Sequence, residues 1–227
     1  MSVIDVSSIR SHPSDAVRDS LAATVSRSMR FMNDPATSIV QIDAGPFLEE
    51  LRSLVGSALD DVNEGKTDLL RGIHQESGGS SKLNAARDIV LDVIDRTVLG
   101  ALQSMVFVQR AWDKVPYYHV DTAALTMVLP LRNAPTFYTL DRFVDGSEQA
   151  SFGCAMPLNA IRHSEAMPAS VFFTGDNEIV LMKGVAWAGI DDALVHSPPH
   201  GPRGKVSPPV AKALILEFDV ASRLTAG

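Results

Sequence analysis

The sequence changes character near residue 104, and this change constrains the fold more than any other feature. Before it, apolar residues recur at three- and four-residue steps, the pattern of amphipathic helices. After it, short stretches rich in β-branched and aromatic residues are separated by Gly, Pro and Asp, the pattern of strands joined by turns. The predicted strands are 105–110, 117–129, 136–140, 170–174, 179–182, 193–196 and 212–220. Many short strands in succession predict a sandwich or small barrel with helices packed outside.

The N-terminal part is predicted to hold three helices and one strand. Ser14 or Asp15 can cap the first helix, which ends at an Asn-Asp-Pro sequence at 33–35. The stretch 38–43 alternates as a strand does, and Pro46 opens the second helix. The third helix follows a glycine-containing joint, and neither half of the chain looks self-sufficient. We therefore expect a single domain over 1–227, with a mainly helical part at 1–103 and a β core at 104–220.

Composition excludes several classes of function. The net charge is −7, and no basic run is interleaved with aromatic residues, so nucleic-acid binding is not expected. The N-terminus lacks the pattern of a signal peptide, and no apolar run is long enough to cross a bilayer. The single cysteine, Cys154, cannot form an internal disulfide, which fits a reducing compartment. The sequence predicts a cytoplasmic protein with no membrane partner and favours no oligomeric state.

A His-x-Asp pair and a distant histidine form the candidate site. Side chains two apart on a strand share a face, so His119 and Asp121 are expected to point the same way. His196 lies on a late predicted strand before a Pro-Pro turn. Two imidazoles and one carboxylate, with other coordination positions open, suit non-haem Fe(II) oxygenases. These three residues are the predicted metal ligands.

Five motifs, in this order, carry a resemblance to a known superfamily. They are Tyr118-His119-Val120-Asp121, Pro135-Thr136-Phe137-Tyr138, Lys183-Gly184-Val185-Ala186-Trp187, His196-Ser197-Pro198-Pro199 and the final strand from Lys212 to Asp219. Together they resemble the Fe(II)/2-oxoglutarate-dependent oxygenases, and within them a poorly characterised bacterial family. Two features depart from that pattern: Ser197 follows the distal histidine where an arginine is common, and the stretch 199–209 is longer.

The resemblance implies an α+β fold with a double-stranded β-helix core, of the jelly-roll or cupin-like type, and N-terminal helices outside. It also implies Fe(II) bound by His119, Asp121 and His196, with 2-oxoglutarate as cosubstrate and dioxygen as oxidant. The implied outcome is hydroxylation of a small organic molecule, with desaturation or ring formation left open. The loops 142–167 and 197–209 are expected to shape the substrate pocket.

The resemblance further implies a basic residue that binds the far carboxylate of 2-oxoglutarate. Lys212 fits at the head of the last strand, on what looks like an inward apolar face; Arg132 and Arg203 are competing anchors. Arg203 is also placed to clamp an acidic substrate. Thr136 and Tyr138 share a strand face and are candidates to hydrogen-bond a carboxylate. Ordinary cross-strand packing is the alternative for both.

Two other functions stay open at this point. A cupin-like dioxygenase or isomerase can use a comparable metal site without 2-oxoglutarate. A non-enzymatic β-sandwich binding module is the second alternative, in which the histidines are structural and metal leaves stability unchanged.

Overall fold

The structure, a computed structural model, describes residues 14–59, 65–68, 80–111, 117–140, 160–162, 170–188, 193–197, 199 and 210–219. Its helices are α1 (Asp15–Met32), α2 (Gly45–Val55), the 3-10 turn η1 (Gly56–Leu59), α3 (Ser80–Asp95) and the single turn α4 (Val185–Ala188). The Oγ of Ser14 caps α1 by accepting from the backbone N–H of Val17 at 3.3 Å, as predicted. Pro46 lies in the first turn of α2. No described helix combines the length and apolar character needed to span a membrane.

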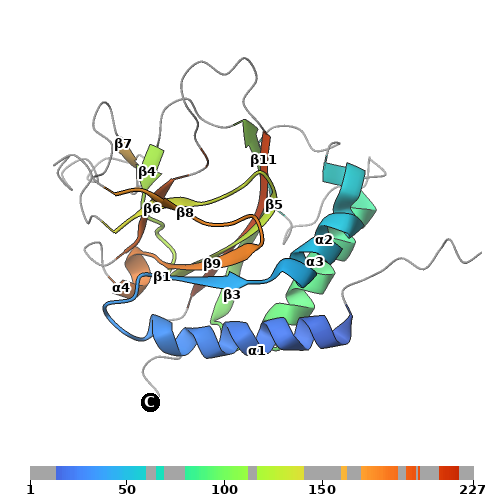
Figure 1. The fold of residues 1–227 in the computed structure, drawn as a ribbon, viewed down its shortest axis with the longest axis horizontal. Coiled ribbons are helices and arrows are strands. Elements are labelled where there is room, and N and C mark those ends of the chain that lie inside the picture. Colours follow the sequence, from blue (N-terminus) through green and yellow to red (C-terminus); the bar gives the residue numbers. More distant parts are fainter. Residues whose placement is uncertain are drawn as a thin grey trace, which may run out of the picture.

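The strands form two antiparallel sheets (Figure 1). The large sheet runs in the order β1 (Ile39–Asp43), β9 (Glu178–Lys183), β5 (Leu125–Arg132), β11 (Val210–Asp219), β3 (Ala101–Ala111) and β2 (Gly65–Asp68). The small sheet runs in the order β7 (Ala160–Arg162), β4 (Tyr117–His119), β10 (Val195–Ser197), β6 (Phe137–Thr139) and β8 (Phe172–Phe173).

The path of the chain between the sheets defines the fold. From β3 onward the chain visits the large and small sheets in turn, except that β6, β7 and β8 all lie in the small one. The resulting inner orders are β3-β11-β5-β9 and β4-β10-β6-β8. Eight strands wound in this way between two facing sheets are a jelly roll. The predicted double-stranded β-helix with helices packed outside is therefore confirmed.

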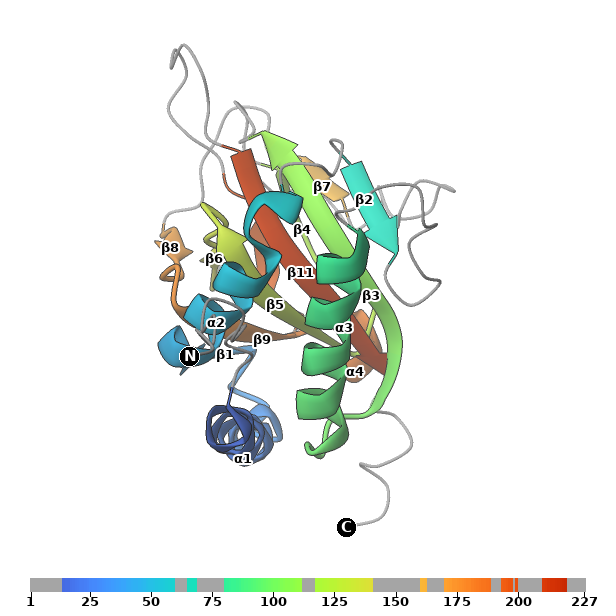
Figure 2. The same ribbon diagram turned by 90° about the vertical axis from the view of Figure 1, so that its right-hand side faces the viewer.

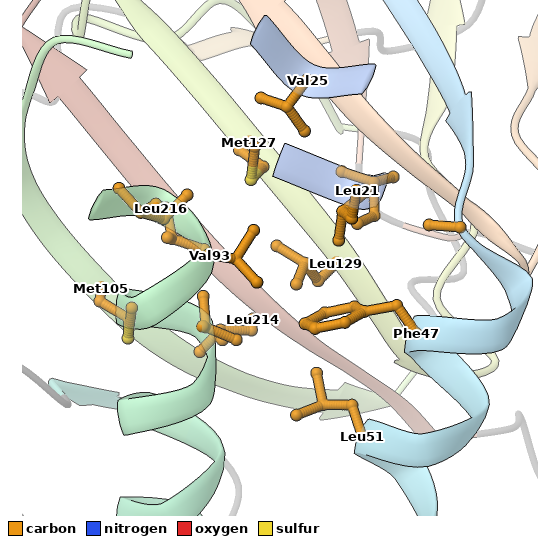
Figure 3. Close-up of a cluster of buried hydrophobic side chains, with 14 of the residues drawn as sticks. Leu21, Val25, Phe47, Leu51, Val93, Met105, Met127, Leu129, Leu214 and Leu216 are labelled. Carbon is orange, nitrogen blue, oxygen red and sulfur yellow. The ribbon is translucent and has the colours of Figure 1, made fainter. Parts of the chain in front are cut away.

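Helices α1, α2 and α3 cover one face of the large sheet (Figure 2). On β11, Leu214, Leu216 and Phe218 point to this helical side and join its main cluster of buried side chains. Phe47 and Leu51 of α2 project into the same cluster (Figure 3). Each such fully buried side chain contributes roughly 1.5–3 kcal/mol relative to exposure. The opposite face of the sheet is left to line the interior of the jelly roll.

Three elements differ from the sequence prediction. The predicted strand 117–129 is two strands, β4 and β5, which lie in different sheets and are joined by bends at 122–124. One strand of that length would span about 40 Å, more than a small jelly roll needs, so the chain turns across to the facing sheet. The stretch 65–68 forms the edge strand β2, which was not predicted, and β7 lies within the predicted loop 142–167.

Candidate metal centre

His119, Asp121 and His196 come together at one end of the jelly roll. His119 ends β4 and is the direct antiparallel partner of His196 on β10. The ring centroids of the two histidines are 4.3 Å apart. Asp121 follows β4 by two residues and reaches both rings: its Oδ1 lies 3.7 Å from His119 Nε2, and its Oδ2 lies 3.6 Å from His196 Nε2. One ligand atom from each residue lies within 4.8 Å of the others.

These separations are too long for hydrogen bonds and slightly longer than the spacing of ligand atoms around one metal ion. Both His–Asp distances exceed the 2.7–3.2 Å typical of N–H···O hydrogen bonds. Ligand atoms held about 2.1 Å from one ion lie about 3.0–3.4 Å apart for right-angled to tetrahedral geometry. The three side chains are only 9–20% exposed, so the site is sheltered but open on one side. A neutral imidazole pair with one carboxylate is a donor set that Fe(II) accepts.

The ring of His196 is oriented by a backbone carbonyl. Its Nδ1 lies 3.2 Å from the carbonyl oxygen of Leu194. Because a carbonyl can only accept, Nδ1 must carry the proton, and the lone pair of the neutral ring is left on Nε2. That nitrogen is the one that faces Asp121. In metal-binding histidines, a hydrogen-bond acceptor on the ring nitrogen that does not bind the metal fixes the tautomer in this way.

A glycine turn fixes the backbone beside Asp121. The N–H of Gly184 donates to the carbonyl of Ala124 at 2.9 Å, and the N–H of Val185 donates to the carbonyl of Asp121 at 2.8 Å. A Cβ on Gly184 would overlap the carbonyl oxygens of Ala123 and Asp121. Only glycine permits this approach, so the turn after β9 sets the position of the carboxylate ligand.

The three candidate ligands line a pocket of about 130 Å³ between the sheets. Its apolar lining includes Val128, Met182 and Ile215, and its polar lining includes Thr126, Thr136, Ser197 and Glu217 beside the three candidate ligands. Among the described lining residues there is no lysine or arginine. The interior is therefore acidic rather than basic in the part of the chain that the structure describes.

Lys212 does not lie in this pocket. The residues of β11 that face the pocket are Ala211, Ala213, Ile215 and Glu217. Lys212 is on the opposite face, 3% exposed, and its Nζ donates to the carbonyl of Leu59 at the end of η1. The prediction that Lys212 holds a cosubstrate inside the barrel does not fit this placement. A cation at the C-terminal end of a helical segment stabilises its last carbonyls, which accounts for a buried lysine here.

Replacing Lys212 by alanine is expected to lower the free energy of unfolding by about 1–3 kcal/mol, because a buried carbonyl loses its donor. Affinity for a metal ion and for 2-oxoglutarate should be unchanged. Denaturant unfolding and metal titration of the same variant check this, and Lys212→Met, which keeps the apolar stem, isolates the hydrogen bond. Loss of 2-oxoglutarate binding at unchanged stability would restore the anchoring role to Lys212.

Of the other residues predicted to contact 2-oxoglutarate, Thr136 is found in the pocket lining, where it is 6% exposed. Tyr138 packs beside the smaller apolar cluster; burial raises the pKa of its phenol, and its Oη accepts from Gln41 Nε2 at 3.2 Å. Arg132 ends β5, is exposed, and is the cross-strand partner of Lys212. Arg203 lies outside the described residues.

Comparisons with known proteins give structural neighbours only. No protein-family model matches the sequence, and no curated protein does. Iron-bound HygX from Streptomyces hygroscopicus is 15% identical, with a TM-score of 0.46 over 86% of this chain and 87% of that one. The same protein with nickel and 2-oxoglutarate is 14% identical, with a TM-score of 0.46 over 84% of each chain.

A prolyl hydroxylase from Trichoplax adhaerens, in complex with a hypoxia inducible factor peptide fragment, is a further neighbour. It is 11% identical, with a TM-score of 0.49 over 92% of this chain and 94% of that one. Since these identities lie below 25% and the TM-scores below 0.5, the chemistry of the site has to be inferred from its own residues.

Proposed function

We propose that this protein is a non-haem Fe(II)- and 2-oxoglutarate-dependent oxygenase that acts on a small organic molecule. The observation that carries the proposal is the convergence of His119 Nε2, His196 Nε2 and the Asp121 carboxylate at the mouth of a jelly-roll pocket. These three residues would hold the metal ion. When bound, Fe(II) and 2-oxoglutarate would supply oxidising power from dioxygen for attack on a substrate C–H bond.

The protein groups prepare the site for such chemistry. The Asp121 carboxylate offsets part of the charge of a divalent ion, and the Leu194 carbonyl keeps His196 in the tautomer that can bind it. Three protein ligands leave positions for other groups. Val128, Met182 and Ile215 present an apolar wall that keeps water from the reacting centre. Hydroxylation is the default outcome of this arrangement.

Thr136 and Arg203 are the proposed contacts for the far carboxylate of the cosubstrate. Thr136 lines the pocket and carries a hydroxyl group that can hydrogen-bond a carboxylate. Arg203, one of the two arginines predicted as competing anchors, lies in the stretch 197–209, which begins directly after His196. We also propose a reducing, cytoplasmic location, on the basis of the single cysteine.

A cupin-like oxygenase or isomerase that does not use 2-oxoglutarate is the second candidate function. The observation that favours it is the lack of lysine and arginine among the described residues of the pocket lining. A dianionic cosubstrate needs a cationic partner when it is buried. If Arg203 does not supply that partner, this alternative fits better.

An anaerobic titration separates the two. Fe(II) and then 2-oxoglutarate are added to the purified protein while the visible absorption is recorded. A weak charge-transfer band that requires both additions, and that is lost in His119→Ala, supports the first function. Iron binding without the band supports the cupin-like function, and Arg203→Ala should weaken the 2-oxoglutarate dependence only in the first case.

Metal alone is expected to stabilise the native protein. At a free concentration a hundredfold above its Kd, a ligand that binds only the native state adds about 2.7 kcal/mol. For a chain of this size, that corresponds to a rise in Tm of about 5–11 °C. Thermal unfolding with Mn(II), which avoids oxidation of iron, measures the effect. A Tm that does not respond to any divalent transition metal would favour the non-enzymatic binding module.

A further inference from the structure

A row of polar side chains crosses the inner face of the large sheet. On β11, Glu217 is the cross-strand partner of Ser104 on β3 and of Thr126 on β5. Directly paired residues of an antiparallel sheet project to the same face, so the three residues form one row. Glu217 and Thr126 line the same pocket as the candidate metal ligands. Further along the pocket face, β11 is apolar, with Ile215, Ala213 and Ala211.

The carboxylate of Glu217 lacks a cation among the described residues that line the pocket. Ser104 Oγ donates to Glu217 Oε2 at 2.6 Å, which orients the group but leaves its charge uncompensated. An ionised carboxylate can only accept hydrogen bonds. Glu217 is half-buried, so water screens its charge only in part, and a ligand with a positive charge gains an attractive interaction at this position.

Thr126 adds an independent observation. The residue is only 2% exposed, and its Oγ1 has no hydrogen-bond partner in the part of the chain that the structure describes. Buried hydroxyls in native proteins are normally satisfied. This one lies beside Glu217 in the row, so an occupant of the pocket that binds the carboxylate can also satisfy the hydroxyl. Together, Glu217 and Thr126 present hydrogen-bond acceptors that suit a group with several N–H donors.

We propose that Glu217 and Thr126 bind a primary ammonium group of the substrate. The inference rests on the proposed function only in taking the occupant of this pocket to be the substrate. Glu217 and Ala213 are four residues apart on β11, about 13 Å along the strand. Charge repulsion from Glu217 keeps an anionic cosubstrate toward the Ala213 end of the pocket. The substrate class is therefore a small aliphatic amine, and Glu217 is its specificity-determining residue.

The test compares three small probes of similar shape: butylammonium, butan-1-ol and butyrate. Their affinities for the Mn(II)-loaded full chain are measured by saturation-transfer NMR, and broadening of probe protons by Mn(II) reports proximity to the metal. Butylammonium should bind about tenfold or more tightly than the other two, the factor expected for a hydrogen bond to a charged group. Glu217→Gln, which keeps the shape of the side chain, should remove that preference.

The inference is overturned if butylammonium has no advantage in the wild type, including the case in which no probe binds, or if Glu217→Gln keeps the advantage. Metal content is measured separately on each sample. Absence of Mn(II) with the ammonium preference intact would refute the proposed oxygenase and leave the amine site standing, so the two failures are distinguishable.

Thr126→Val provides a second variant that should fold at least as well as the wild type. Removal of a buried hydroxyl that lacks a partner is expected to raise Tm by about 2–4 °C. The same variant should bind butylammonium more weakly, because one acceptor is lost. A rise in stability together with a fall in affinity indicates a ligand-binding role, whereas an unchanged affinity would limit the site to Glu217 and contradict the paired assignment.

Discussion

Replacing Asp121 by asparagine, or either candidate histidine by alanine, is expected to reduce metal affinity by more than about a hundredfold. Changes to groups that merely orient metal ligands already cost ten- to a hundredfold, and loss of a ligand removes a bond to the ion itself. Asp121 should be the most sensitive of the three, because its two oxygens face both histidines, at 3.7 and 3.6 Å. Metal titration and the metal-dependent rise in Tm measure the loss.

Asp88→Asn is a suitable control for this experiment. Asp88 is an aspartate on α3, which packs on the helical face of the large sheet; its side chain is 63% exposed and does not line the pocket. Its substitution should leave metal affinity and Tm unchanged. If Asp121→Asn kept full metal affinity, the His–Asp–His cluster would be a structural arrangement and the proposed function would fail.

Replacing Gly184 by alanine is expected to be the most damaging change of a residue whose own side chain is not a candidate metal ligand. The added methyl would overlap two backbone carbonyl oxygens, those of Ala123 and Asp121, and backbone cannot move aside as a side chain can. Overpacking of this kind costs about 1–3 kcal/mol and sometimes more. The displaced backbone carries Asp121 with it, so metal affinity should fall as well. Denaturant unfolding and metal titration measure the two effects.

Gly45→Ala is the matched control for the glycine substitution. A Cβ at Gly45 would meet nothing closer than 3.6 Å, and the residue opens α2, where alanine is favourable. This variant should be as stable as the wild type or slightly more so, with unchanged metal affinity. Equal behaviour of the two variants would mean that the Gly184 turn does not position Asp121.

The motif containing Gly184 shows how far local sequence patterns reach. The Lys-Gly-x-x-Trp turn is visible in the sequence. Its role, however, depends on the backbone carbonyls of Asp121 and Ala124, about 60 positions earlier. In the structure, Lys183 Nζ donates to the carbonyl of Asp34 at 2.7 Å and lies 5.7 Å from the centroid of the Trp187 ring. The contact with Trp187 is local, but the one with Asp34 joins residues 149 positions apart, and a single sequence carries no signal for such a pairing.

Periodicity and residue type by themselves determined the helices, most of the strands and the three residues of the candidate metal centre. The helical stripes of α1 to α3 and the β pattern after residue 104 are local properties, and so is the spacing of His119 and Asp121. What alternation cannot decide is which face of a strand becomes the interior when both faces are buried.

In β11, tertiary packing determines which face points into the jelly roll. The more apolar face, with Leu214, Leu216 and Phe218, packs against the helices, since that interface has the larger apolar area to bury. Lys212 lies on this same face, where it donates to the carbonyl of Leu59 at the end of η1. Glu217 lies on the opposite face and lines the pocket. Sequence alone therefore identified the candidate metal ligands, because two nearby residues and one histidine suffice for them. Which other side chains line the pocket depended on how the sheets and helices pack.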